Sequence, residues 1–429
     1  MLLRFEASNH RSIMDPVEIS MVAVDEDRAA ARSFDSLSER VLTVAGIYGA
    51  NASGKSNVLD SIAWLSMAVK GSLYAWDDVI PRDPFKFGAY PEKSSSFELD
   101  MMVRGVRYSY ALEVNDESVV FEGLYSYPER RRRSLFEREG MDFHLRRGLG
   151  VLSGTRELLT PTTLALTAAM RFDFPEVRSF GQAIVNIGLL GGRHKEMWRR
   201  NRMVPRHAST ERMLQVLSDP DQPTLFTLDS DRFSGRESAL ALLKFADLGI
   251  DGVQIDEQDG LVKASTSLGE SRRQLRLLHS AGEQRLPFDM SEESEGTQMW
   301  FRLIGPVLYA LRTGQTLLFD EIDASLHPKL SAKLLELFQD PDTNPAGSQL
   351  IFTTHDTSLL NHLNRDEVWL TDKALNGSTQ LTALAEYGGD KVRRSLNLEK
   401  AYLQGRFGAV PDFDQYLLRQ ALGLVAEGR

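Results

Sequence analysis

The chain has 429 residues, of which 42% are hydrophobic, and its formal net charge is −10. This length is sufficient for two or three domains with substantial cores, and the negative charge argues against a wholly basic nucleic-acid coat. The lack of cysteine excludes disulfides and thiolate chemistry and favours a reducing, cytoplasmic location. Because there is neither an apolar run of about 18 residues nor a signal-peptide pattern, we expect no membrane spanning and no secretion.

The N-terminal part of the chain alternates strand patterns with one helical run. Residues 2–7, 17–22 and 41–48 have the composition of strands, and the last of these is almost entirely apolar. The helical run 57–65 follows. Residues 96–103 and 106–114 alternate at period two around Arg104-Gly105, which predicts an antiparallel hairpin.

A phosphate-binding loop stands between the apolar strand and the helical run. Two glycines bracket four residues and are followed by Lys-Ser, and a glycine-rich turn at a helix N-terminus can direct backbone N–H groups toward an anion. Lys55 would reach the β- and γ-phosphates of ATP, and the Ser56 hydroxyl would hold Mg²⁺. The expected nucleotide-binding residues here are Gly49, Ala50, Asn51, Ala52, Ser53, Gly54, Lys55, Ser56 and Asn57.

The middle of the chain has a different pattern. From about 126 to 245 helical spacing is broken by Gly and Pro, which suggests an inserted, mostly helical subdomain. It contains two basic clusters, Arg130–Arg133 and Arg193–Arg206, the second with Trp198. Strand spacing returns at 252–256 and 261–264.

The C-terminal part supplies candidate catalytic groups at two strand ends. The apolar run 316–319 ends in Asp320, a candidate Mg²⁺ ligand, and Glu321, a candidate base for the attacking water. Taken alone, such a run is typical of any strand that meets solvent, and only the phosphate loop favours the catalytic interpretation. The strand 349–354 ends at His355, which a parallel neighbour could place beside the γ-phosphate.

Together these motifs resemble those of ATP-binding-cassette (ABC) ATPases. That class has a serine-containing signature before the carboxylate strand, and Ser294-Glu295-Gly296-Thr297 is similar to the Ser-x-Gly-Thr form of chromosome-maintenance (SMC) and recombination-type (RecF) ATPases. More narrowly, the chain resembles AAA15-type ATPases, close to the overcoming-lysogenisation-defect and restriction-linked ATPases of bacteria. The narrower resemblance rests on residues 8–12, 294–297, 320–323, 354–356, 365–369 and 402–411.

The resemblance implies an α/β P-loop NTPase fold. We expect an ABC-type head with an antiparallel β subdomain and the helical insert, divided as 1–125 (phosphate-loop lobe), 126–280 (insert) and 281–429 (signature, carboxylates and His355). It also implies that two copies sandwich ATP head to tail, with the phosphate loop of one chain facing Ser294 and Gly296 of the other. Further nucleotide contacts are expected from Thr297, Asp323 and Arg11, although Arg11 could equally form a surface ion pair.

Three functions remain open at this point. The first is a defence ATPase that senses phage and controls a separate nuclease or toxin. No nuclease-like carboxylate cluster stands out in this chain, and Asp229 and Asp231 are interpreted as a polar turn. The second is a DNA clamp in repair or maintenance that uses the basic clusters, with Trp198 stacking on a base or lying in a core. The third, disfavoured by the form of the signature, is a transporter motor.

Overall fold

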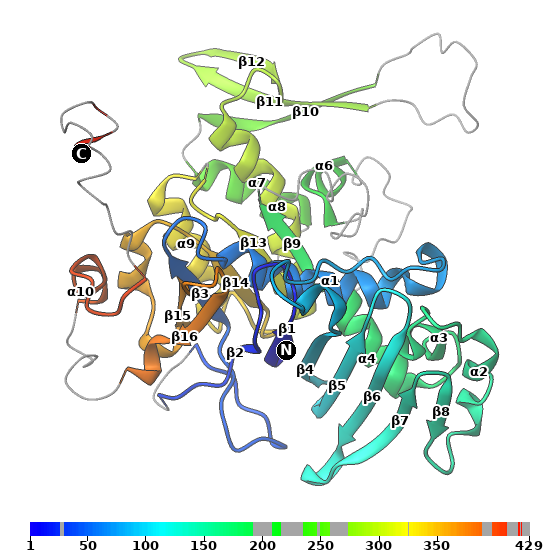
Figure 1. Cartoon of the computed structure of the whole chain (residues 1–429). Coiled ribbons are helices and arrows are strands. Elements are labelled where there is room, and N and C mark those ends of the chain that lie inside the picture. Colours follow the sequence, from blue (N-terminus) through cyan, green and yellow to red (C-terminus); the bar gives the residue numbers. More distant parts are fainter. Residues whose placement is uncertain are drawn as a thin grey trace.

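Three sheets organise the computed structural model of the chain (Figure 1). The structure describes residues 1–25, 30–191, 208–215, 235–246, 249–257, 273–324, 326–387, 397–409, 419–420 and 422. Its helices are α1 (Lys55–Ala75), α2 (Thr155–Leu158), α3 (Ala165–Ala169), α4 (Pro175–Val185), α6 (Thr210–Gln215), α7 (Gly235–Phe245), α8 (Glu295–Thr313), α9 (Pro328–Gln339) and α10 (Leu398–Leu403).

The core sheet carries the nucleotide motifs. Its order is β16 (Thr379–Ala383), β15 (Val368–Lys373), β3 (Val44–Gly49), β14 (Gln349–Thr353), β13 (Thr316–Asp320) and β9 (Gly188–Gly191), and every pair except β15–β16 is parallel. β3 is buried along its whole length because both faces are covered. Ala45 and Ile47 belong to the core that contains α1, whereas Val44 and Tyr48 belong to the core that contains α8 and α9.

An antiparallel sheet of seven strands covers the other side of α1 (Figure 1). Its order is β2 (Val17–Ser20), β1 (Leu2–Ser8), β4 (Ser95–Val103), β5 (Val106–Val114), β6 (Val119–Tyr127), β7 (Arg133–Glu139) and β8 (Asp142–Leu145). The predicted hairpin is confirmed: β4 and β5 pair antiparallel around Arg104-Gly105, both of which have positive φ. Trp64 of α1 stacks on Phe97 of β4, with ring centroids 4.4 Å apart, so helix and sheet share one core.

The third sheet stands apart, next to α6, α7 and α8 (Figure 1). It consists of β10 (Ile250–Glu257), β11 (Arg273–Ala281) and β12 (Gln284–Asp289), all antiparallel. β10 confirms the strand expected at 252–256, while the one expected at 261–264 lies outside the described residues. β12 leads directly into α8, so this sheet and the signature motif are joined by a short segment.

The described part of 126–245 contains three strands that the sequence did not predict. β7 and β8 extend the seven-stranded sheet, and β9 joins the core sheet. The helical expectation was wrong for these three segments, while α2, α3, α4, α6 and α7 lie in the same range. β7 was missed because Arg138, which should face solvent in an alternating strand, is fully buried.

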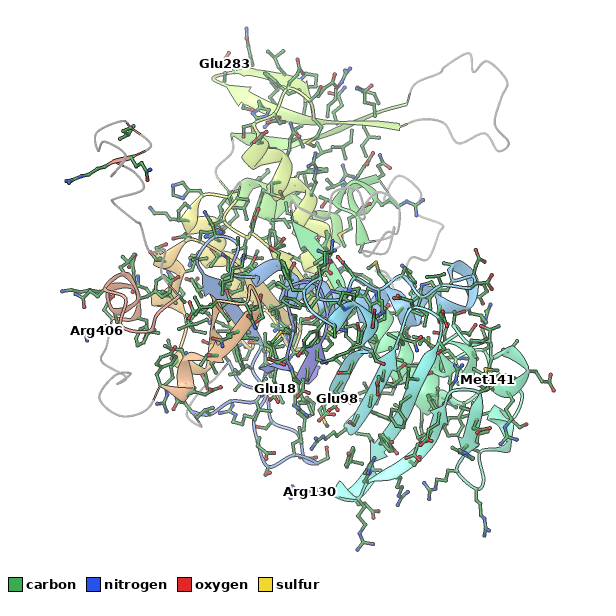
Figure 2. The ribbon with its side chains drawn as sticks, in the orientation of Figure 1. Glu18, Glu98, Arg130, Met141, Glu283 and Arg406 are labelled. Carbon is green, nitrogen blue, oxygen red and sulfur yellow. The ribbon has the colours of Figure 1, made fainter. Side chains whose placement is uncertain are left out.

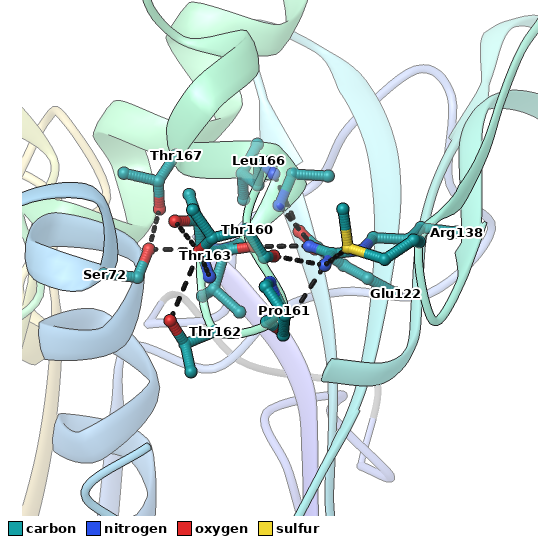
Figure 3. A network of polar contacts seen from close by, with 12 residues as sticks. Ser72, Glu122, Arg138, Thr160, Pro161, Thr162, Thr163, Leu166 and Thr167 are labelled. Atoms are coloured by element: carbon teal, nitrogen blue, oxygen red, sulfur yellow. Dashed lines mark hydrogen bonds and ion pairs between the residues drawn. The ribbon is translucent and has the colours of Figure 1, made fainter. Parts of the chain in front are cut away.

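A buried polar network explains how Arg138 is accommodated (Figure 3). Its guanidinium donates to the carbonyl oxygens of Thr160 at 2.7 Å and Gly140 at 2.6 Å and lies 4.0 Å from the Glu122 carboxylate. Glu122 in turn accepts from the hydroxyl of Tyr110 and from two backbone N–H groups at the start of α3. The ion pair thus fixes α3 on the sheet.

Candidate functional site

The phosphate loop joins β3 to α1, as predicted. Lys55, the first residue of α1, is buried, and its Nζ donates to the carbonyl oxygens of Gly49 at 2.9 Å and Ala50 at 3.0 Å. The ammonium group therefore lies within the turn. Asn51 and Ala52 are exposed at its tip, and Ala52 has a left-handed φ of 62°.

Both glycines of the loop are required by close packing as well as by backbone conformation. Gly54, which precedes α1, has a φ of 106°, and a Cβ there would meet the side chain of Thr379. At Gly49 a Cβ would meet Thr371. β15 and the start of β16 pack against the phosphate loop. A side chain at either glycine would therefore displace the loop from these strands.

Hydroxyl groups from segments that are distant in the sequence form hydrogen bonds that hold the phosphate loop in place. Ser53 Oγ lies 2.6 Å from Thr371 Oγ1, and Thr379 Oγ1 donates to the carbonyl oxygen of Ser53 at 2.9 Å. Ser12 Oγ lies 2.7 Å from Thr379 Oγ1 and accepts from Asn57 Nδ2 at 2.5 Å. Thr371 and Thr379 were not identified from the sequence, because isolated threonines carry no motif.

The core sheet brings the carboxylates to the same edge as the phosphate loop. β14 lies between β3 and β13, and all three are parallel, so Gly49, Asp320 and His355 follow neighbouring strand ends. Asp320 is fully buried; its Oδ1 accepts from Thr353 Oγ1 at 2.8 Å. Its Oδ2 is buried without a hydrogen-bond partner among the described residues. An unmatched buried carboxylate oxygen fits a Mg²⁺ ligand.

Glu321 begins the turn after β13 in a left-handed conformation, with a φ of 57°. Its N–H donates to Thr353 Oγ1 at 2.8 Å, and the N–H of Ile322 donates to the Thr353 carbonyl at 3.1 Å. Non-glycine residues adopt this conformation only where their surroundings impose it. Thr353 therefore binds the carboxylate of Asp320 and the backbone of Glu321, a role that the sequence did not reveal.

Asp323 connects the turns that follow β13 and β14. Its carboxylate accepts from Thr354 Oγ1 at 2.8 Å and from the backbone N–H of His355 at 3.2 Å. The His355 side chain is exposed at this edge. Close by, burial raises the pKa of Tyr48 well above its usual value, and the charges of Asp356 and Asp323 add to that effect, so Tyr48 stays neutral.

The signature residues form the first turn of α8. Ser294 is the N-cap: its Oγ accepts from the backbone N–H of Thr297 at 3.1 Å and lies 2.9 Å from the Thr297 hydroxyl. Ser294 is exposed and Gly296 is partly exposed, so this helix N-terminus meets solvent in the single chain. Such an end favours anions.

Arg11 and the first basic cluster make other contacts in the single chain. Arg11 Nε is 2.9 Å from Asp60 Oδ2 and 3.5 Å from Asp83 Oδ2, and its contact with a phosphate stays a prediction. Arg130–Arg133 are exposed at the turn between β6 and β7, where Figure 2 shows Arg130 at one extreme of the molecule. The second cluster at 193–206, Trp198 and the residues Asp229 and Asp231 lie outside the described residues.

The fold and these motifs define a P-loop ATPase of the ABC type. The chain belongs to the AAA_21 family, described as "AAA domain, putative AbiEii toxin, Type IV TA system", whose model matches residues 44–159 and 193–361. That match covers more than half of the chain and confirms the class of ATPase expected from the sequence. Among curated proteins, no sequence matches this chain.

Two solved structures are similar over most of their length. The SMC head domain from Thermotoga maritima has 14% identity and a TM-score of 0.39, covering 89% of this chain and 98% of that one. An SmcHead bound to the C-winged helix domain of ScpA has 14% identity and a TM-score of 0.46, covering 89% of this chain and 97% of that one. A bilayer-spanning helix is absent from the described part of the chain, since none combines sufficient length with sufficient hydrophobicity.

Proposed function

We propose that this protein hydrolyses ATP at the edge of the core sheet formed by β3, β14 and β13. The observation that carries this proposal is the buried Asp320 carboxylate at the end of β13. One of its oxygens has no hydrogen-bond partner among the described residues, and only β14 separates β13 from β3, the strand before the phosphate loop. Ser56 and Asp320 would hold Mg²⁺, which would neutralise phosphate charge. Lys55 would bind the phosphates, Glu321 would accept a proton from the attacking water, and His355 would orient the γ-phosphate.

ATP would be held between two copies of the chain. The exposed first turn of α8 supports this arrangement, since its N–H groups at Ser294 and Gly296 could receive the γ-phosphate of the other copy. With ATP, Glu321→Gln should sediment as a dimer, and with ADP as a monomer. Adding Ser294→Arg should restore the monomer while ATP binding to each chain persists. A dimer that survives Ser294→Arg would contradict the sandwich.

The biological role that we propose is control of a separate effector, a nuclease or toxin, in bacterial defence against phage. The family description, which names a toxin system, supports this role, as does the resemblance to AAA15-type ATPases. In the described ranges no cluster of His, Asp or Glu offers a second metal centre that could serve a nuclease. A native pull-down of Glu321→Gln with ATP should recover a stoichiometric second protein of nuclease or toxin type.

A DNA clamp is the second candidate, and the exposed turn at Arg130–Arg133 favours it. If the four arginines contact DNA phosphates, the logarithm of the binding constant should fall linearly with the logarithm of the salt concentration. The slope should be about −0.9 for each phosphate that is neutralised. A titration of duplex DNA binding against salt tests this role, with Arg171 and Arg178 as exposed control positions. No binding at low salt, or recovery of only a protein effector in the pull-down, would exclude the clamp.

A further inference from the structure

One end of the seven-stranded sheet brings together arginines from three separate segments of the chain. Because neighbouring strands are antiparallel, the β4–β5 turn, the β6–β7 turn and the end of β8 all lie at this end. The N–H of Arg146, just after β8, donates to the carbonyl oxygen of Leu135 in β7 at 3.3 Å. In Figure 2, Arg130 marks this end of β7 and Met141 marks the other. We call it the arginine end.

Most guanidinium groups of the arginine end are open to solvent and have no carboxylate partner. Arg107 is the exception, since it forms an ion pair with Asp100 at 2.5 Å. Seven further arginines are exposed and make no ion pair with any carboxylate in the part of the chain that the structure describes. They are Arg104, Arg130, Arg131, Arg132, Arg133, Arg146 and Arg147.

Carboxylates at the arginine end are fewer than arginines. Glu129 and Glu137 adjoin the β6–β7 turn. Asp35 and Glu39 lie near the β4–β5 turn, because the hydroxyl of the intervening Ser36 donates to the backbone of that turn at 2.8 Å. The end therefore keeps an excess of positive charge in a chain whose formal net charge is −10. Such an excess on one surface attracts a polyanion.

The arginine end lies away from the candidate ATP site, because β4 runs from one side of the molecule to the other. The first residues of β4 pair with Ser8, which leads to Ser12 beside the phosphate loop. Its last residues lie beside Leu2, whose backbone is bound by the side chain of Gln349 at the start of β14. His355 follows the opposite end of β14. A ligand at the arginine end would therefore lie outside the space between two copies that sandwich ATP.

The size and chemistry of the arginine end fit the backbone of a nucleic-acid duplex. From β4 to β8 there are four inter-strand spacings, about 19 Å, and a duplex of this length carries about 11 phosphate charges. The guanidinium fork matches the geometry of phosphate. Arg132 already lies over the ring of the buried Tyr125, and Arg107 over that of Tyr127. Single-strand binding depends on free aromatic faces, so a duplex is favoured.

An acidic protein fits this end less well. Protein interfaces have an apolar centre surrounded by a polar rim. None of the exposed large apolar side chains in the described ranges belongs to the β4–β5 turn, the β6–β7 turn or the two residues after β8. The arginine end therefore offers charge without an apolar centre, which is the pattern of contacts to a phosphate backbone.

We propose that the arginine end binds the phosphate backbone of a nucleic-acid duplex, without reading its sequence and outside the ATP sandwich. Arg104, Arg146 and Arg147 contribute together with Arg130–Arg133. This site differs from a DNA clamp, which would enclose DNA between two copies and would require ATP. The proposal goes beyond ATP hydrolysis and does not depend on it.

The test is a fluorescence anisotropy titration of a short labelled DNA duplex with the full chain at several salt concentrations. If each of the seven arginines neutralises one phosphate, the slope of log K against log salt should be about −6. Arg104→Gln/Arg146→Gln/Arg147→Gln keeps the four consecutive arginines. We expect this variant to bind at least about tenfold more weakly at low salt, with a slope less negative by about 2.7.

The matched control is Arg285→Gln/Lys333→Gln/Arg406→Gln, which removes the same charge from exposed positions on β12, on α9 and after α10. It should bind the duplex like the wild type. ATP turnover should be the same in both triple variants and in the wild type, because none of these side chains belongs to the candidate ATP site. If no chain hydrolyses ATP, the proposed function fails while the DNA titration still tests the arginine end.

The outcomes separate the arginine end from its alternatives. Equal weakening in the two triple variants would overturn the proposal, since net charge alone would then explain it. Binding by the Glu321→Gln chain only in the presence of ATP would also overturn it, in favour of a clamp. Polyglutamate that displaces the duplex at equal charge concentration would assign this end to an acidic protein. A wild-type slope shallower than about −2 would contradict the proposal even if the variant did not fold.

Discussion

Two fully buried carboxylates, in two different sheets, differ in whether both of their oxygens have partners. Glu122 in the antiparallel sheet has both oxygens engaged by Tyr110, by backbone N–H groups and by Arg138. Asp320 in the parallel sheet has one oxygen bound by Thr353 and the other without a partner among the described residues. The first arrangement serves stability, and the second leaves a place for a ligand that the chain does not contain.

The surroundings of each carboxylate explain the difference. Glu122 caps the start of α3 inside a closed core, where burial raises its pKa and Arg138 and the N–H groups oppose that rise. Asp320 ends a parallel strand, and ligands of open α/β sheets bind beyond such carboxyl ends. Substitutions at the two sites should therefore affect different properties.

The largest effect is expected at Glu321. Glu321→Gln should lower ATP turnover by about 100- to 10,000-fold, since a positioned general base contributes this much to catalysis. ATP affinity should stay within a few fold of the wild type, because the amide keeps the size of the side chain. Hydrolysis is followed by phosphate release and binding by equilibrium dialysis. Normal turnover in this variant would remove Glu321 from the role of base.

Glu122→Gln should reduce stability by about 3–5 kcal/mol, because it leaves the Arg138 charge buried without its partner. Urea unfolding measures this loss. Turnover below the unfolding transition should change little. The double variant Glu122→Leu/Arg138→Met should recover much of the stability, since apolar residues of similar volume can replace a buried pair. A stable single variant would show that the ion pair does not fix α3 on the sheet.

Lys55→Ala should weaken ATP binding by about 10- to 100-fold, the value of losing charge-assisted hydrogen bonds to phosphate. Isothermal calorimetry measures the affinities for ATP and for adenosine. Only the affinity for ATP should fall, because adenosine has no phosphate that Lys55 could bind. Unchanged ATP affinity would contradict the assignment of the phosphate loop.

Thr353→Val should have the smallest effect, a loss of turnover of about tenfold. The valine keeps the shape but cannot donate to Asp320 or accept from the Glu321 N–H. Thr316→Val is the matched control, since it loses a hydrogen bond to Gln349 at the opposite end of β13. If both variants lose turnover equally, Thr353 contributes through stability alone.

The sequence alone was sufficient to locate those candidate residues that belong to one contiguous segment. The phosphate loop, Asp320, Glu321 and His355 each adjoin an apolar run, and parallel pairing then brings the strand ends to one edge. The signature role of Ser294 stays a prediction from its motif, and the structure shows this residue as the N-cap of α8. These features depend on local chemistry.

What could not be predicted depends on contacts between distant segments. Thr353, Thr371 and Thr379 are ordinary residues in the sequence and gain meaning only from their partners across the sheet. β7 was not predicted because Arg138 is buried with Glu122. This pairing joins two strands and cannot be predicted from a local sequence pattern.

The most direct test of the account is binding of Mn²⁺, a spectroscopic substitute for Mg²⁺, to wild-type protein and to Asp320→Asn in the presence of ATP. Electron paramagnetic resonance should detect one bound Mn²⁺ per ATP in the wild type and at least tenfold weaker binding in Asp320→Asn, with no loss in the free energy of unfolding. Undiminished Mn²⁺ binding, together with a loss of stability comparable to that of Glu122→Gln, would show that Asp320 is structural and would contradict the account.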